Sequence, residues 1–237
     1  MSPWRIKAVE LVSEIVKKNE ILNVFEVGCD DAGISRELAK KYSSIQFNGI
    51  DIRKKEIESA NYYKEEEKLN NVKFDYGYFL DITNTDIQYD IIIFTEVYEH
   101  LVAENQIYSL RLLGNLLSPN GFLIFTSPNG DYILSYLEKE KSFEKRYPEN
   151  FFDDMKQTDH WLEPTQKEIN KIFVSLGFDI LESRYFNLPK RKYQIINKMD
   201  KIEILMMKLL SCKILLMRKI KKVQKQTICN AEFNFFT

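Results

Sequence analysis

The chain has 237 residues, of which 44% are hydrophobic and 29% are charged, and this balance excludes a disordered or collagen-like protein. Its 34 Lys and Arg residues nearly cancel its 35 Asp and Glu residues, so the net charge of -1 selects neither nucleic acid nor a membrane as partner. The three cysteines are too few and too far apart for a disulfide framework or a cysteine zinc site. The sequence shows neither a signal-peptide pattern nor an apolar run of about 18 residues, so we expect a cytoplasmic protein.

Helix-like and strand-like segments alternate along the first part of the chain. Apolar residues at helical spacing predict a helix over residues 4–18, and the apolar run 21–28, which ends in a glycine, predicts a buried strand. The same criteria then predict a helix over 34–42, a strand over 45–50 and a charged helix over 53–69.

The alternation continues in the second part of the chain. Strands are predicted over 72–80, 89–95, 122–126 and 178–186, helices over 106–117 and 164–176, and a last strand over 227–236. The turn sequence Ser118-Pro119-Asn120-Gly121 ends the first of these helices. Because helices separate strands that are almost continuously apolar, the predicted fold class is α/β, a doubly wound, mostly parallel seven-stranded sheet with helices on both faces, as in Rossmann-like proteins.

A basic segment near the C-terminus differs from the rest of the chain. Residues 189–226 carry twelve Lys and Arg residues against two acidic residues, a net charge of +10 that leaves -11 elsewhere. We expect one domain over 1–188 with a lid over 129–160 and a final strand of the same sheet within 227–237. Between them we expect a basic amphipathic insertion over 189–226, with one helix or two that include 202–220. Three roles are open for this insertion. It packs on its own domain with a solvated basic face, it contacts an anionic membrane surface or an apolar substrate through 193–225, or it binds a partner helix.

Glycine and acidic residues follow four of the predicted strands. Gly28 follows the first strand, Asp51 the second and Asp81 the third, and the sequence Thr95-Glu96-Val97-Tyr98-Glu99-His100 ends and follows the fourth. In an open parallel sheet, ligands bind beyond the carboxyl ends of the strands. A glycine turn lets a ligand approach the backbone, and a carboxylate at the spacing of Asp51 is suited to a ribose diol.

With these residues, the sequence from Val24 to Arg184 resembles the class I S-adenosylmethionine-dependent methyltransferases of the small-molecule type with a Glu-x-x-Glu-His motif. The resemblance implies S-adenosylmethionine (SAM) as the cofactor, with Gly28 near its methionine part, Asp51 on the ribose hydroxyls and Asp81 on the adenine amino group. The residues that it implies around the cofactor are Glu26, Gly28, Cys29, Asp51, Ile52, Asp81, Ile82, Thr95 and Glu96.

The first motif departs from the family pattern Glu-x-Gly-x-Gly-x-Gly, because Asp30 and Ala32 replace the second and third glycines. The added carboxylate of Asp30 either repels the methionine carboxylate of SAM or pairs with its ammonium or sulfonium group. This departure leaves a non-catalytic cofactor-binding relative as one alternative.

Methyl transfer depends mainly on alignment of the acceptor with the methyl group, and on removal of a proton from the acceptor. His100 and His160 are the two histidines of the chain, and we predict them as catalytic residues together with Glu99, because a neutral imidazole is a suitable base near pH 7. Alternatively, Glu96, Glu99, His100 and His160 form a ligand set for a divalent ion such as Mg²⁺.

The prediction for the whole chain is O-methylation of a small-molecule acceptor, such as a sugar, a ring hydroxyl or a lipid-linked intermediate. An RNA 2′-O-methyltransferase that uses a divalent metal is a second alternative. Nucleic acid is the less favoured partner, because the body of the chain is acidic and phosphate-binding proteins present basic faces.

Overall fold

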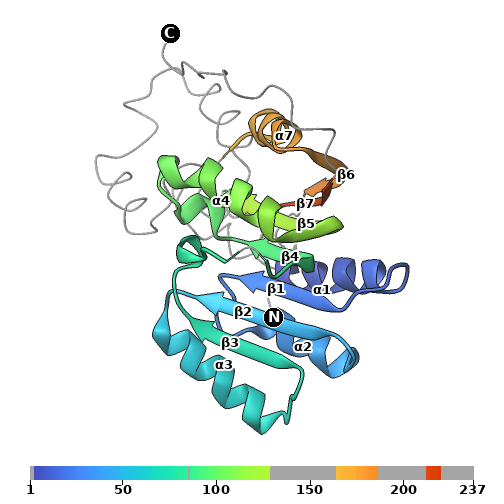
Figure 1. Ribbon diagram of the computed structural model, residues 1–237, viewed down its shortest axis with the longest axis vertical. Helices are drawn as coiled ribbons and strands as arrows, with labels where there is room; N and C mark the ends of the chain where they lie inside the picture. The colour runs from blue at the N-terminus through green and yellow to red at the C-terminus, as the bar shows by residue number, and fades with distance from the viewer. Residues whose placement is uncertain (1–2, 85, 129–163, 186–211, 220–237) are drawn as a thin grey trace, which may run out of the picture.

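The computed structural model describes residues 3–84, 86–128, 164–185 and 212–219, and its strands form one sheet (Figure 1). The strands are β1 (Asn23–Val27), β2 (Gln46–Asp51), β3 (Val72–Tyr76), β4 (Tyr89–Thr95), β5 (Leu117–Pro128), β6 (Phe178–Tyr185) and β7 (Cys212–Lys219). Their order across the sheet is β3-β2-β1-β4-β5-β7-β6. Strands β1 to β5 run parallel to one another, which confirms the predicted mostly parallel α/β sheet.

The first described helix precedes β1 and the others separate strands along the chain, as the sequence predicts. They are α1 (Pro3–Val16), α2 (Gly33–Lys41), α3 (Lys54–Glu66), α4 (Ala103–Leu116) and α7 (Gln166–Ser175), with the 3-10 turns η1 (Phe79–Asp81) and η2 (Tyr98–His100). Helix α7 begins at a capping box, in which the Thr165 hydroxyl accepts from the Glu168 N–H and the Glu168 carboxylate accepts from the Thr165 N–H.

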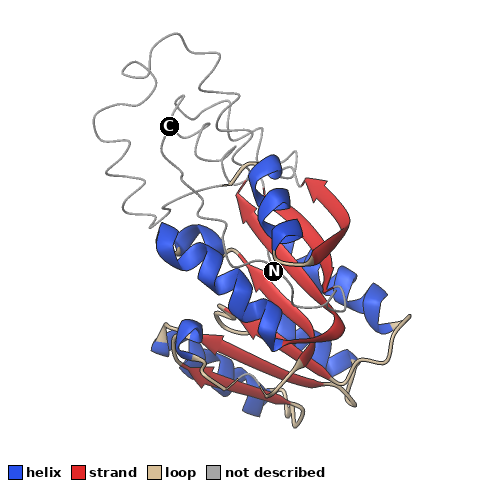
Figure 2. Cartoon of the chain, turned by 45° about the horizontal axis from the view of Figure 1, so that its top comes forward, coloured by secondary structure: helices blue, strands red, loops and turns tan. Residues whose placement is uncertain are grey.

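Helices cover both faces of the sheet (Figure 2). In β4, Ile91 and Ile93 are fully buried in a cluster with residues of α1, α2 and α3, whereas Ile92 and Phe94 are fully buried in a second cluster with residues of α4 and α7. Because successive side chains of a strand point to opposite faces, a strand covered on both sides is apolar at every position. This explains the unbroken apolar run of β4.

Strand β5 begins earlier than predicted because it contains the turn sequence as a bulge. Tyr89 lies opposite Leu117 and Ile91 lies opposite Phe122, so the four residues 118–121 correspond to Asp90 alone and β5 carries three extra residues. Within the bulge, the Ser118 hydroxyl donates a hydrogen bond to the Asp90 carboxylate at 3.1 Å. The turn signal therefore marks an irregularity inside the strand and not its start.

The prediction of a helix over 202–220 is wrong for residues 212–219, which form β7. This strand lies between β5 and β6 and is antiparallel to both. A short apolar run fits helix and strand periodicity equally well, and pairing with two neighbouring strands decides between them. Residues 129–163, 186–211 and 220–237 lie outside the described residues, and with them the predicted lid, His160 and the predicted strand at 227–236.

Peripheral membrane contact through 193–225 stays a prediction, because residues 193–211 and 220–225 lie outside the described residues. Within the ranges that the structure describes, no helix is long and apolar enough to cross a membrane.

Candidate cofactor and active site

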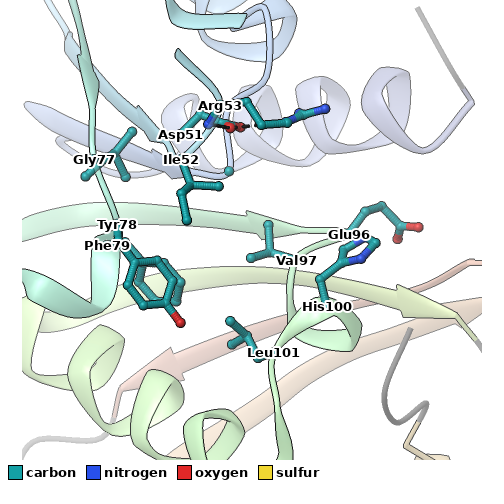
Figure 3. Close-up of a pocket in the computed structure, with 12 residues that line it drawn as sticks. Asp51, Ile52, Arg53, Gly77, Tyr78, Phe79, Glu96, Val97, His100 and Leu101 are labelled. Atoms are coloured by element: carbon teal, nitrogen blue, oxygen red, sulfur yellow. Dashed lines mark hydrogen bonds and ion pairs between the residues drawn. The ribbon is translucent and has the colours of Figure 1, made fainter. Parts of the chain in front are cut away.

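A cavity of about 600 Å³ lies at the carboxyl ends of β1, β2, β3 and β4 (Figure 3). Its lining comes from residues that end or follow these four strands: Gly28, Ile50, Asp51, Ile52, Arg53, Gly77, Tyr78, Phe79, Glu96, Val97, His100 and Leu101. Five predicted site residues, namely Gly28, Asp51, Ile52, Glu96 and His100, therefore meet around one space. Parallel strands end at the same edge of a sheet, which brings together residues that lie far apart in the sequence.

Gly28 is required at its position for two separate reasons. Its φ of +67° is a left-handed conformation that residues with a side chain rarely adopt, and a Cβ there would come within 2.3 Å of Val97 Cγ2. The Gly28 N–H also donates to the Ile50 carbonyl at 2.8 Å, which ties the β1 turn to the end of β2. The missing side chain therefore makes room for Val97, which lines the cavity beside Gly28.

Asp51 places a buried carboxylate against the same cavity. Its Oδ2 accepts the Asp30 N–H at 2.8 Å, and its Oδ1 accepts the Arg53 N–H at 2.8 Å and the Arg53 Nε–H at 3.3 Å. A carboxylate has about four acceptor positions, so these three bonds orient the group and leave acceptor capacity for a ligand. Figure 3 shows Asp51 and Arg53 together on one side of the space, with Ile52 projecting toward its centre.

The apolar wall of the cavity includes residues that the sequence did not mark as binding residues. Gly77, Tyr78 and Phe79 line the cavity because β3 ends at Tyr76, several residues before the predicted end of the strand. Asp81 lies instead in η1, where it is exposed, and neither it nor Ile82 lines this cavity. Their predicted contact with the adenine remains a prediction.

Three predicted cofactor residues lie beneath the cavity and do not line it. Glu26 is buried, and its carboxylate accepts the Ser35 N–H at 3.0 Å and the Ser35 hydroxyl at 2.5 Å. Burial raises the pKa of Glu26 to about 7, although the hydrogen bonds from Ser35 act in the opposite direction. Burial likewise raises the pKa of the Cys29 thiol, so Cys29 is a packed thiol rather than a reactive one. Thr95, at the end of β4, is also buried.

The Glu-x-x-Glu-His segment after β4 contains a 3-10 turn rather than a turn of α-helix. Glu96 has φ +54°, and its carboxylate accepts the Thr126 hydroxyl at 2.7 Å, which fixes it against β5. The following 3-10 turn η2 places His100 on the cavity and buries Glu99 away from it. Figure 3 shows Glu96 and His100 side by side on one wall.

The metal alternative receives no support from the described ranges, which contain no group of three or more His, Cys, Asp or Glu side chains able to hold a metal ion. Because His160 lies outside these ranges, the complete four-residue set stays a prediction.

Asp30 and Ala32 both adopt the backbone conformation that glycine favours, with φ +56° at each position. The fold therefore keeps the glycine-type turn without the glycines. Asp30 is anchored by ion pairs with Arg5 of α1 and, at 3.2 Å, with Arg53. Burial raises the pKa of Asp30, but the hydrogen bond and charge of Arg5, with the charge of Arg53, outweigh it and hold this pKa below its usual range.

Comparison with known proteins shows which family the chain resembles. A model of a methyltransferase domain matches residues 18–177. An uncharacterized protein of Rickettsia prowazekii (strain Madrid E), RP028, is 29% identical over 110 residues, which are 46% of this chain and 44% of that protein. The chain thus matches less than half the length of this curated relative.

Two solved methyltransferase structures share the fold. One is magnesium protoporphyrin IX methyltransferase from Synechocystis PCC 6803 with bound S-adenosyl-L-homocysteine (SAH). It superposes with a TM-score of 0.65 at 18% identity, over 91% of this chain and 81% of that one. The N-methyltransferase NodS from Bradyrhizobium japonicum WM9 in complex with SAH superposes with a TM-score of 0.62 at 13% identity, over 93% and 89%. Since the family model covers more than half of the sequence, the chain belongs to the methyltransferase domain family.

Proposed function

We propose that the chain transfers the methyl group of SAM to a hydroxyl oxygen of a small molecule. The observation that carries this proposal is the single cavity that joins Gly28 and Asp51 on one side to His100 on another. Its volume of about 600 Å³ lies within the range of about 300–1,000 Å³ that is usual for small-molecule sites.

The residues on the β1 and β2 side fit the adenosyl and methionine parts of SAM. Asp51 is a buried carboxylate with acceptor capacity for ribose hydroxyls, and Gly28 lines the same cavity. Ile52 and Phe79 supply apolar surface for an adenine ring. When bound, SAM supplies an electrophilic methyl group on a sulfonium sulfur.

The acceptor side of the site is built by the turn after β4. His100 is exposed and lines the cavity, so its imidazole can take the proton from an acceptor hydroxyl. Glu96 adds a carboxylate on the same wall, which favours the positive charge of the donor, and Tyr78 and Leu101 add apolar surface to the cavity. An alcohol or phenol needs a base for methylation, whereas a neutral amine does not, and this favours oxygen as the acceptor atom.

The RNA alternative is less well supported by the described site. Arg53 is the single Lys or Arg side chain among the described residues that line the cavity, and it is already paired with Asp51 and Asp30. A site that tracks a phosphate backbone presents several cationic side chains.

A turnover assay tests the proposal. The full chain is incubated with methyl-labelled SAM and panels of sugars, hydroxylated rings, lipid-linked alcohols, amines and short RNA, and SAH formation and the labelled product are measured. We expect a hydroxylated small molecule as the acceptor, with labelled product unaffected by a chelator. In His100→Gln, kcat should fall by about 10²- to 10⁴-fold at unchanged SAH affinity, because a general base contributes on this scale.

Glu104→Gln is the matched control, since Glu104 is exposed on α4 and does not line the cavity. Turnover of amines alone would refute oxygen as the acceptor atom. Chelator-sensitive turnover of RNA alone would support the metal-dependent alternative in place of this proposal.

A further inference from the structure

Four charged side chains form a continuous line from α1 to the cavity. Asp30 lies between two guanidinium groups: Arg5 contacts its Oδ2, and Arg53 Nη2 lies 3.2 Å from its Oδ1. Arg53 in turn donates to Asp51, and Asp51 accepts the backbone N–H of Asp30. Helix α1 is thereby connected to the carboxylate that faces the cavity, although Arg5 itself does not line the cavity.

The backbone of this turn needs such an anchor. Both Asp30 and Ala32 have a φ of +56°, a left-handed conformation that is unfavourable for residues with a side chain. In the family pattern, glycines make this conformation easy. Here the turn is held instead by the ion pairs of Asp30, whose partner Arg5 is largely buried.

The position of the Asp30 carboxylate argues against repulsion of the ligand. Each of its oxygens contacts a guanidinium group, so its charge is balanced, and Asp30 is not among the residues that line the cavity. Arg53 benefits from the same arrangement, because it is held beside Asp30 and Asp51. Figure 3 shows its side chain extending alongside Asp51 rather than into the space between Ile52 and Leu101.

We propose that Arg5 and Asp30 are positioning residues for the nucleoside-binding carboxylate Asp51, so that helix α1 sets the affinity for SAM without touching it. Without Asp30, Arg53 keeps only Asp51 as a partner among these four side chains. Its guanidinium then occupies the positions on the Asp51 carboxylate that would accept the ribose hydroxyls. Without Arg5, Asp30 keeps a single guanidinium partner and the strained turn loses its anchor. The inference rests on the proposed role of Asp51.

A double-mutant cycle on the full chain tests this proposal, with SAH as the probe and isothermal titration calorimetry as the readout. Arg5→Ala and Asp30→Ala should each weaken SAH binding about tenfold, and the double variant should weaken it no more than about tenfold, because both changes break one line of contacts. Arg5→Lys restores the charge and should recover part of the affinity. Asp30→Gly, which restores the family glycine, should also weaken binding rather than strengthen it.

Asp31→Ala is the matched control, because Asp31 lies in the same turn and also pairs with Arg5, at 3.1 Å, but is not paired with Arg53. It should lower the unfolding midpoint in urea while the SAH dissociation constant stays within twofold. Equal losses of affinity in Asp31→Ala and Asp30→Ala would overturn the proposal, and so would an Arg5→Ala variant that is less stable but binds SAH normally.

Asp51→Asn separates this inference from the proposed function. Loss of SAH binding in Asp51→Asn together with normal binding in Arg5→Ala refutes the positioning role alone. Normal SAH binding in Asp51→Asn refutes the nucleoside site itself, and the positioning role with it.

Discussion

Glu26→Gln should change how the stability of the protein depends on pH. The Glu26 carboxyl is buried between β1 and α2, and burial raises its pKa from 4.5 to about 7. Between these values the folded protein binds more protons at this site than the unfolded chain. The free energy of unfolding of the wild type therefore falls as the pH rises from about 4.5 to about 7 and then levels off.

The size of this effect follows from the two pKa values. Each tenfold change in proton affinity corresponds to about 1.4 kcal/mol, so the charged Glu26 lowers the stability by about 3 kcal/mol above pH 7 relative to its protonated form. Glutamine has the same shape but no charge, and its amide oxygen can accept from both the Ser35 N–H and the Ser35 hydroxyl, as the Glu26 Oε2 does. The variant should therefore lack this loss of stability.

Urea unfolding followed by circular dichroism at pH 5, 6, 7 and 8 measures the effect. The free energy of unfolding of Glu26→Gln minus that of the wild type should rise by about 2.5 kcal/mol between pH 5 and pH 8, because part of the effect is already present at pH 5. Glu58→Gln is the control, because Glu58 is exposed on α3, and its curve should run parallel to the wild type. A constant difference between Glu26→Gln and the wild type across this range would refute the reasoning.

Three further substitutions test the site and the core. Gly28→Ala should lower the unfolding free energy by more than Gly177→Ala does, because both glycines have positive φ but only a Cβ at Gly28 would meet Val97. Gly28→Ala should also weaken SAH binding in calorimetry, and equal effects of the two substitutions would contradict the crowding argument. Asp51→Asn should weaken SAH binding at least tenfold, whereas Asp75→Asn, at an exposed residue of β3, should not; similar dissociation constants for the two variants would remove Asp51 from the site. Phe125→Ala should cost about 3–5 kcal/mol in urea unfolding, because the ring is fully buried and packs on Phe94, Tyr98 and Phe173; a loss below about 1 kcal/mol would show that the core collapses around the gap.

The order of elements and the main site residues could be predicted from the sequence because they depend on local patterns. Periodicity distinguishes the long helices from the apolar strands, and a parallel sheet brings the ends of β1, β2 and β4 to one edge whatever the packing details. Gly28, Asp51 and His100 were therefore identifiable as neighbours. The family resemblance then connected this edge with SAM.

Tertiary contacts decided the rest, since they join residues that no local pattern relates. The strand at 212–219 became identifiable only through its pairing with β5 and β6, and Glu26 proved to be bound to Ser35 beneath the cavity. Asp30 looked like an obstacle to the ligand in the sequence, because its neutralising partners Arg5 and Arg53 lie on other elements. Residue types and spacing determined which chemistry is available here, while the long-range packing determined which of those groups face the cavity and which support it.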